Sequence, residues 1–364
     1  MATAAAEYRL SSEDRLKNFV RTVLAKVDVD PADAAIVADV LVASDLRGIE
    51  SHGVARLQTY YVSRLRAGRI AARPHVETVR ETGTSILVDA GNGLGHPAAK
   101  RTMESLIAKA REHGAAFGAV RNSNHFGIAG YYAMLALEHD LVGMASTNSV
   151  RFGAPTYGRA IMLGTNPFAY AVPAGQEPAF VLDIATTTVP RGKLEVYKRK
   201  GLPLRPGWAI DAEGHETLDP AVALKGALLP LGGLGVDTGG HKGYGLGMLA
   251  DIFCGVLSGG KFGAGLPLPT DPPAPGPISH WFAAFRVDGF REVAAFKADM
   301  DKQLRAFKDS PKAPGAERIY VAGEIEHEKT LEHRRTGVPV HNAVWNELEQ
   351  LAGDLGVPFD IARD

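Results

Sequence analysis

The spacing of apolar residues changes along the chain, and this change restricts the folds that it can form. For about the first seventy residues apolar side chains recur at the spacing of a helix, and from Val76 onward the spacing drops to two, as in strands. Helical spacing returns near the other end. We therefore expect an α/β fold with a discontinuous helical lobe, in which residues 1–75 pack with residues 290–364 beside a central α/β region at 76–289.

Capping residues and glycines mark the ends of several elements. Ser12 and Asp30 are favourable N-caps, and Gly114 and Gly201 stand where helical spacing stops. We predict helices at 12–27, 31–45, 97–113, 128–138, 191–200, 293–304 and 342–351, and a buried apolar helix at 242–257. We predict strands at 76–80, 85–89, 116–120, 141–145, 168–172, 180–184, 281–287 and 318–321.

Composition excludes several classes of function. Hydrophobic residues make up 45% of the 364 residues, charged residues 22%, and the formal net charge is −1, so nothing favours nucleic acid or an anionic membrane as partner. A single cysteine, Cys254, cannot form an internal disulfide and indicates a reducing compartment. The N-terminus lacks an apolar signal core, so we expect a cytoplasmic protein.

The stretch from Ile49 to Tyr61 concentrates reactive side chains. Ser51 can cap a helix here, and His52, Arg56 and Tyr60 would then share one face at i, i+4 and i+8. Arg56 could hold a small carboxylate while an imidazole that titrates near neutrality moves a proton. The alternative is a surface helix whose polar face is simply solvated.

A glycine-rich turn at 91–96 imitates a dinucleotide-binding loop. It follows a predicted strand and precedes a helix, but its third glycine comes one residue early, and the next strand, ending near Val120, lacks the acidic residue that would bind a ribose. A plain glycine turn explains it better than a Rossmann site.

Other common catalytic and metal-binding patterns do not fit. His327 and His333 are six residues apart and fall on different helix faces, so no metal site is expected. There is no complete phosphate loop and no nucleophile elbow. Ser51 and His52 would point about 100° apart on a helix, which is poor geometry for a hydrolase couple.

Three polar segments at predicted strand ends or helix starts remain. They are Asn122–His125, Thr186–Thr188, and the glycine-lined run around His241 and Lys242. Strand ends of open α/β sheets are common ligand sites, and a lysine at a helix start suits a phosphate or diphosphate. For His125 the alternative is a buried imidazole with satisfied hydrogen bonds.

These segments, taken in order, resemble the type-2 malate/L-lactate dehydrogenase family, which includes ureidoglycolate, sulfolactate and diketogulonate oxidoreductases and piperideine-2-carboxylate reductases. The resemblance is carried by Ser51-His52-Gly53 with Arg56, Arg121 to Gly127, Gly164 to Pro167, Asp183 to Thr187, Arg191-Gly192-Lys193, Gly207-Trp208-Ala209 and His241 to Gly245. It implies a non-Rossmann NAD(P)-binding fold, a homodimer, and hydride transfer between a nicotinamide cofactor, NAD or NADP, and a small 2-hydroxy or 2-oxo acid.

The resemblance also implies roles for individual residues. Ser51, His52 and His125 would be catalytic, with His52 favoured over His125 for proton transfer. The substrate would contact Arg56, Tyr60, Thr165, Arg191 and Gly192. The cofactor would contact His125, Phe126, Gly127, Ile128, Ala129, Asp183, Ile184, Ala185, His241, Lys242, Gly323 and Glu324.

Two departures from the family pattern leave the substrate open. The reductase branch has a carboxylate where this chain has Lys193, so a Ser–His–carboxylate relay is not expected. The loop 149–153 also differs from the commoner family sequence. An imine reductase acting on a cyclic or N-alkyl 2-imino acid is the alternative activity. The main rival function is a dinucleotide-binding sensor without turnover, and the rival from another class is a hydrolase that uses Ser51.

Overall fold

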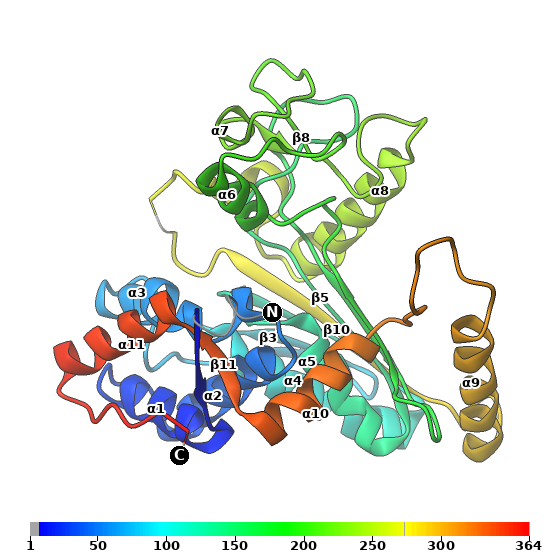
Figure 1. Ribbon diagram of the computed structural model, residues 1–364. Coiled ribbons are helices and arrows are strands. Elements are labelled where there is room, and N and C mark those ends of the chain that lie inside the picture. The colour runs from blue at the N-terminus through cyan, green and yellow to red at the C-terminus, as the bar shows by residue number, and fades with distance from the viewer. Residues whose placement is uncertain (1–6, 273, 364) are drawn as a thin grey trace.

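A seven-stranded mixed sheet forms the centre of the molecule, in the order β2-β3-β4-β10-β5-β6-β7 (Figure 1). The computed structural model describes residues 7–272 and 274–363. The strands are β2 (Glu77–Glu81), β3 (Ser85–Asp89), β4 (Ala115–Ser123), β10 (Ile278–Arg286), β5 (Leu141–Thr147), β6 (Phe168–Val172) and β7 (Phe180–Ile184). Only the β3–β4 pair of this sheet is parallel. The pairing therefore differs from that of a doubly wound parallel sheet.

Sequence explains which strands are central. Most of β10 is apolar and buried, as expected for a strand covered on both faces, and it lies between β4 and β5. By contrast, β2 is exposed along its whole length and carries three charged residues, which suits an edge strand. Helix α4 (Gly95–His113) packs on β4 and β10, and α5 (Ala129–Met134) packs on β5 and β6.

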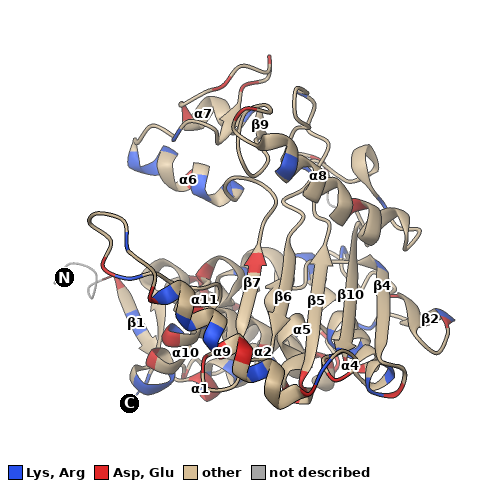
Figure 2. Cartoon of the chain, turned by 90° about the vertical axis from the view of Figure 1, so that its right-hand side faces the viewer, with Lys and Arg blue, Asp and Glu red and all other residues tan. Residues whose placement is uncertain are grey.

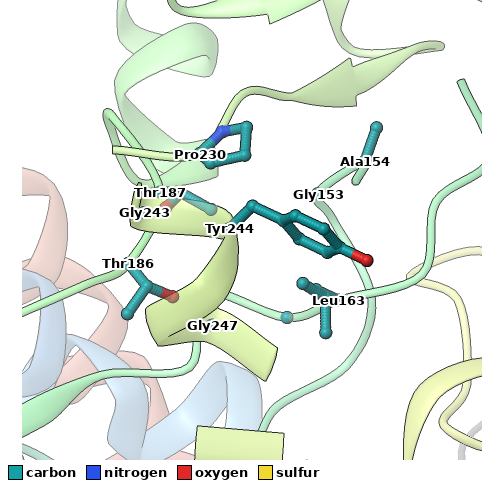
Figure 3. Close-up of a pocket in the computed structure, with 10 residues that line it drawn as sticks. Gly153, Ala154, Leu163, Thr186, Thr187, Pro230, Gly243, Tyr244 and Gly247 are labelled. Carbon is teal, nitrogen blue, oxygen red and sulfur yellow. The ribbon is translucent and has the colours of Figure 1, made fainter. Parts of the chain in front are cut away.

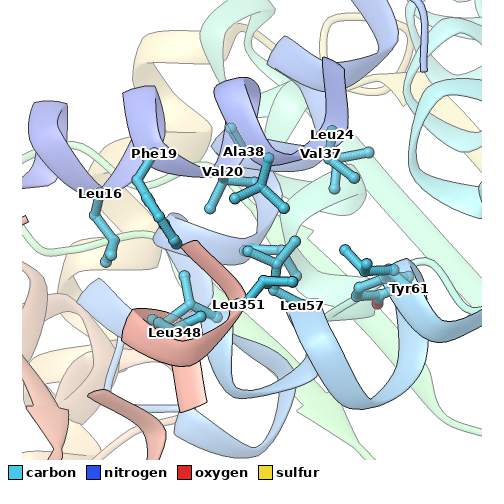
Figure 4. Close-up of a cluster of buried hydrophobic side chains, with 14 of the residues drawn as sticks. Leu16, Phe19, Val20, Leu24, Val37, Ala38, Leu57, Tyr61, Leu348 and Leu351 are labelled. Atoms are coloured by element: carbon cyan, nitrogen blue, oxygen red, sulfur yellow. The ribbon is translucent and has the colours of Figure 1, made fainter. Parts of the chain in front are cut away.

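A second apolar cluster joins helices from both ends of the chain (Figure 4). It combines α1 (Glu13–Ala25), α2 (Pro31–Leu46) and the 54–65 segment with α11 (Asn342–Leu355). Strand β1 (Tyr8–Ser11) pairs with β11 (Val338–His341), and α10 (Glu324–Thr336) lies against α2. Residues far apart in sequence therefore share one core.

Helix α9 (Val293–Lys308) stands to one side of these helices (Figure 1). Its Asp301 accepts hydrogen bonds from three successive backbone amides in the loop between β6 and β7, those of Gly175, Gln176 and Glu177. This contact attaches α9 to the sheet.

The upper lobe comprises residues 149–164 and 186–265 and rises from the end of the sheet at which β5 and β7 end and β6 begins (Figures 1 and 2). It holds α6 (Arg191–Lys200), β8 (Ala209–Ile210), α7 (Pro220–Ala223), β9 (Ala227–Leu228) and α8 (Gly240–Asp251), which a π-helical turn, Ile252–Val256, extends. Two small apolar clusters form its core. None of the described helices is long and apolar enough to cross a membrane.

The predicted α-helix beginning at Ser51 is wrong. The segment instead forms two 3₁₀ turns, Glu50–His52 and Val54–Arg56, a π-helical turn, Leu57–Val62, and the short helix α3 (Ser63–Arg66). Gly53 separates the two 3₁₀ turns because the buried carboxylate of Asp45 lies against it. Any Cβ on Gly53 would overlap that carboxylate, whose Oδ2 accepts a hydrogen bond from the Val54 N–H at 2.9 Å.

Two further predictions need correction. Residues 318–321 form no strand, and Arg318 and Val321 instead donate hydrogen bonds to the Glu324 carboxylate. The apolar segment from Lys242 to Leu257 is helical, but it is not fully buried. Apolar side chains are exposed along one side of it, namely Leu246, Met248, Leu249, Ile252, Val256 and Leu257.

Contacts within the chain account for the glycine-rich turn at 91–95. A Cβ on Gly91 would overlap the backbone of His75, one on Gly93 would press on Pro74, and one on Gly95 would overlap the backbone at Asn124. The Asn124 side chain also donates hydrogen bonds to the carbonyl oxygens of Asn92 and Gly93. The turn is closed by protein atoms where a dinucleotide loop would face a diphosphate.

Candidate active site

The 3₁₀ turn at Glu50–His52 places two predicted catalytic groups in contact. The Ser51 Oγ lies 2.9 Å from the His52 Nδ1, so the expectation that these side chains point apart is wrong. That expectation assumed a regular α-helix, which the Asp45–Gly53 contact prevents. Arg56, in the next turn, donates from Nε to the Ser51 carbonyl oxygen at 2.7 Å. This bond uses Nε and leaves the two terminal nitrogens of the guanidinium for a ligand.

His125 lies against this segment, although it is 73 positions from His52 in the sequence. The two imidazole rings stack, with centroids 5.3 Å apart and planes inclined by 27°. The Tyr60 ring is also 5.3 Å from His125, and the Arg64 guanidinium covers Tyr60 at 3.7 Å. Arg56 is near enough to act on the pKa values of both histidines. The structure therefore brings together Ser51, His52, Arg56, Tyr60 and His125.

Tyr61 belongs to the same cluster, although it is not among the site residues predicted from the sequence. Its ring is fully buried and its hydroxyl lies 2.6 Å from the His125 Nδ1. The expected helix gave no indication of this contact, because it depends on the π-helical turn and on a residue 64 positions away. Two buried histidines nearby, His96 and His280, were also not predicted as part of the cluster.

Burial keeps the imidazoles of this region neutral. Burial, followed by the Arg56 charge, lowers the pKa of His52 to about 4. Burial, then the neighbouring His52, lowers the pKa of His125 well below its ordinary value. Burial also lowers the pKa values of His96 and His280 to about 3. The expectation of a histidine titrating near neutrality therefore fails for the free protein, in which His52 and His125 are uncharged proton acceptors or hydrogen-bond donors.

The loop from β4 to α5 carries five residues predicted to contact the cofactor. Phe126, Ile128 and Ala129 are buried, and His125 is only partly buried. Phe126 stacks between His280, at 4.3 Å, and Tyr132, at 4.7 Å. His280 is fixed in turn by hydrogen bonds of 2.8 Å to the hydroxyls of Ser123 and Thr147.

Asp183, at the end of β7, lies beside this loop. Its Oδ2 accepts a hydrogen bond from the Gly130 N–H at 2.7 Å. Burial raises its pKa to about 6, although the Gly130 bond and the Arg47 charge both act to lower it. Arg47, at the end of α2, faces Asp183 and Glu326. A carboxylate with one oxygen uncommitted and a cation nearby can bind hydroxyls or an anionic group.

Of the remaining predicted residues of the substrate and cofactor sites, Arg191, Gly192, His241 and Lys242 lie in the upper lobe. Ile184 and Ala185 lead into it, and Thr165 is held by Ser149, whose Oγ accepts its N–H at 3.1 Å. Arg191 donates to the Leu224 carbonyl oxygen, and Gly192 faces open space. Among the described residues no hydrogen bond joins Thr165 or Arg191 to the histidine cluster. The two sets lie in different parts of the fold.

A small pocket lies where the end of β7 meets α8 (Figure 3). Its lining includes Thr186, Thr187, Gly243, Tyr244 and Gly247. Exposed residues His241 and Lys242 stand at the start of the same helix.

Gly323 and Glu324 occupy the start of α10. Gly323 packs against Val181, where a Cβ would lie 2.7 Å from the valine Cβ. The buried Glu324 carboxylate accepts hydrogen bonds from Arg318 at 2.7 Å and Lys308 at 3.1 Å. Both cations are side chains of this chain, so the Glu324 carboxylate has a structural role in holding Arg318 and Lys308 at the start of α10. In the described part of the chain no three histidine, cysteine or acidic side chains gather as metal ligands would.

Comparison with known proteins identifies the family. The family model described as malate/L-lactate dehydrogenase matches residues 11–349. The chain belongs to this family. It is 43% identical to a malate dehydrogenase of Pyrococcus abyssi over 347 residues, covering 95% of this chain and 94% of the relative. It is 36% identical to an L-sulfolactate dehydrogenase of Methanocaldococcus jannaschii, covering 94% and 96%.

Solved structures of the family share the fold. The malate dehydrogenase of Pyrococcus horikoshii superposes with a TM-score of 0.87 at 38% identity, covering 96% of this chain and 97% of that one. A Δ1-piperideine-2-carboxylate reductase of Pseudomonas syringae is more distant, with a TM-score of 0.82 at 27% identity, covering 94% and 100%. The resemblance deduced from the sequence motifs is confirmed.

His96 provides a test of the buried imidazoles. Neither of its ring nitrogens has a hydrogen-bond partner, so His96→Phe removes an unsatisfied polar group and fills a similar volume. Because the folded state resists protonation of His96, the wild type loses stability as pH falls below the unfolded pKa of about 6.5. Between pH 7 and pH 5, the free energy of unfolding of the variant should fall by about 2 kcal/mol less than that of the wild type, as measured by urea unfolding. Equal losses in the two proteins would show that His96 is not held neutral.

Proposed function

We propose that this protein transfers a hydride between a nicotinamide cofactor and the C2 atom of a small 2-hydroxy or 2-oxo acid. The observation that carries the proposal is the cluster itself, in which two neutral imidazoles stack beside an arginine with free terminal nitrogens. An arginine fork binds a carboxylate in two parallel hydrogen bonds, and a neutral imidazole next to it can take a proton from the adjacent hydroxyl.

Arg56 would fix the substrate and also prepare His52 for the reaction. Bidentate binding of the carboxylate fixes the positions of C2 and of the oxygen on it. Holding these reacting atoms in the correct orientation increases the rate. The Arg56 charge is the second cause of the low His52 pKa. A bound carboxylate neutralises that charge, so the His52 pKa rises in the complex and the imidazole becomes a better base.

His52 would move the proton. During oxidation the 2-hydroxyl proton passes to the His52 imidazole as the hydride leaves C2, and the reverse transfer accompanies reduction. Ser51 holds the Nδ1 of His52, so Nε2 is the nitrogen that exchanges the proton. The cofactor, when bound, accepts or supplies the hydride.

Residues at the end of β7 and at the start of α8 could bind the two parts of a dinucleotide. Asp183 has an oxygen uncommitted beside the 125–129 backbone, which suits ribose hydroxyls. His241 and Lys242 at the start of α8 suit the diphosphate. Lys198, Arg199 and Lys200 give α6 a basic end (Figure 2), which would favour the 2′-phosphate of NADP if the cofactor extends that far.

The substrate most consistent with the relatives carries a second anionic group. Malate and sulfolactate, the substrates named for two relatives, both carry a second anionic group in addition to the carboxylate of the 2-hydroxy acid. Arg191, beside the open space at Gly192, is the upper-lobe cation that we assign to this group, with Thr165 lining the same side. Tyr60 would close the site next to Arg56.

A cofactor and substrate screen tests the activity. Nicotinamide absorbance should report turnover of oxaloacetate, sulfopyruvate or pyruvate with NADH or NADPH. Turnover of a cyclic imine in place of every 2-oxo acid would establish the alternative reductase activity instead. Tight cofactor binding without turnover of any of these compounds would indicate a sensor and contradict the proposal.

Replacement of Arg56 by lysine tests the carboxylate site. Lysine keeps the charge but loses the planar fork, so kcat/KM for the 2-oxo acid should fall about 30- to 1000-fold, mainly through KM. The matched control is Arg21→Lys on α1, an exposed arginine paired with Asp39, which should leave KM unchanged. An unchanged KM in Arg56→Lys would remove Arg56 from the site.

We also propose that the protein is a homodimer and that the exposed apolar side of the 242–257 segment is part of the interface. Six large apolar side chains on this side have exposed fractions from 39% to 61%. An apolar surface of this kind typically marks a protein interface. Sedimentation equilibrium should therefore give twice the 38.7 kDa chain mass, and Leu249→Asp should lower it toward one chain. A monomeric wild type would contradict this assignment.

A further inference from the structure

We propose that Tyr61 is a positioning residue that holds His125 as the tautomer protonated on Nε2. His125 then acts as a neutral hydrogen-bond donor to the substrate oxygen, and proton transfer is left to His52. This inference rests on the proposed function for its catalytic consequence, but the tautomer itself can be measured without substrate.

Two donors converge on the same nitrogen of His125. The Gly127 N–H points at Nδ1 from 3.3 Å, and the Tyr61 hydroxyl lies 2.6 Å from it. A backbone N–H can only donate, so the Nδ1 that receives it must carry a lone pair. The hydroxyl, which can donate or accept, must then donate as well. The proton of the neutral imidazole is therefore on Nε2.

The surroundings prevent the ring from changing this arrangement. Tyr61 is fully buried, and its ring packs edge-on against His96 at 4.9 Å and against Tyr60 at 5.2 Å. The stacked His52 ring covers one face of His125. Gly127 has a φ of +80°, where a residue with a side chain would be strained, so the loop that presents its N–H is specific to glycine.

This arrangement divides the work between the two histidines. An imidazole with Nδ1 occupied by two donors and a proton on Nε2 has no free lone pair, so it cannot accept the substrate proton. It can donate a hydrogen bond to the oxygen on C2 and stabilise the charge that develops there during reduction. His52 lacks this constraint because its Nδ1 partner is a serine hydroxyl, which can donate or accept.

Nitrogen NMR of protein labelled at histidine tests the tautomer directly. Signals of the substrate-free protein, assigned with His125→Asn, should show His125 protonated on Nε2 with Nδ1 as an acceptor. In Tyr61→Phe the ring packing is retained but one donor is lost, so the signals should shift toward a tautomer mixture. The control Tyr132→Phe also removes a buried hydroxyl, one bonded to the Phe126 carbonyl oxygen, and should leave the His125 tautomer unchanged.

Kinetics give the second measurement. Tyr61→Phe should lower kcat by about 10- to 100-fold, the scale found when the partner that orients a metal-ligating histidine is removed, with little change in KM because Arg56 is untouched. A wild-type His125 protonated on Nδ1 would overturn the proposal, even if Tyr61→Phe does not fold. So would a folded Tyr61→Phe that keeps both tautomer and kcat. A confirmed tautomer in a wild type that turns over no 2-oxo acid would instead refute the proposed function alone.

Discussion

The contact between Asp45 and the Gly53–Val54 backbone determines the course of the chain through the candidate site. Asp45 is 4% exposed, lies near the end of α2, and binds the Val54 N–H. A buried carboxylate is costly without partners, and here burial raises its pKa well above the usual range. Its position against Gly53 breaks the helix into separate turns. That break lets Ser51 reach His52 and turns Tyr61 toward His125.

Burial then determines the protonation state of the histidines that this path of the chain brings together. His96 and His280 are buried, His52 and His125 are partly buried, and the first cause of each lowered pKa is the loss of solvation. Neutral imidazoles lie next to the exposed guanidinium of Arg56. In the function that we propose, Arg56 balances the charge of the substrate carboxylate, and this carboxylate raises the pKa of the base that acts on the substrate.

Local sequence was a good guide where local forces decide structure. β6, β7 and α6 have the predicted bounds, because alternation, helical spacing and the terminal Gly201 all depend on neighbouring residues. The Ser12 and Asp30 caps also form as expected. The family motifs supplied the candidate site residues. They could not reveal the turns at 50–62, because the cause, Asp45, acts through a tertiary contact with a glycine.

The roles of Tyr61 and His96 were hidden for the same reason. Their partners lie tens of residues away, and a tyrosine at apolar spacing looks like an ordinary core residue. Likewise, the apolar run at 242–257 was expected to be buried, since sequence hydrophobicity does not distinguish a core from an interface.

The crystal structure of the complex with NADH or NADPH and oxamate, an unreactive 2-oxo acid analogue, tests the central claim most directly. The account predicts the oxamate carboxylate on the two terminal nitrogens of Arg56, its carbonyl oxygen within hydrogen-bond reach of His52 and His125, and the nicotinamide against the 125–129 backbone. An analogue held by another cation, with both imidazoles out of reach of its carbonyl, would contradict the account.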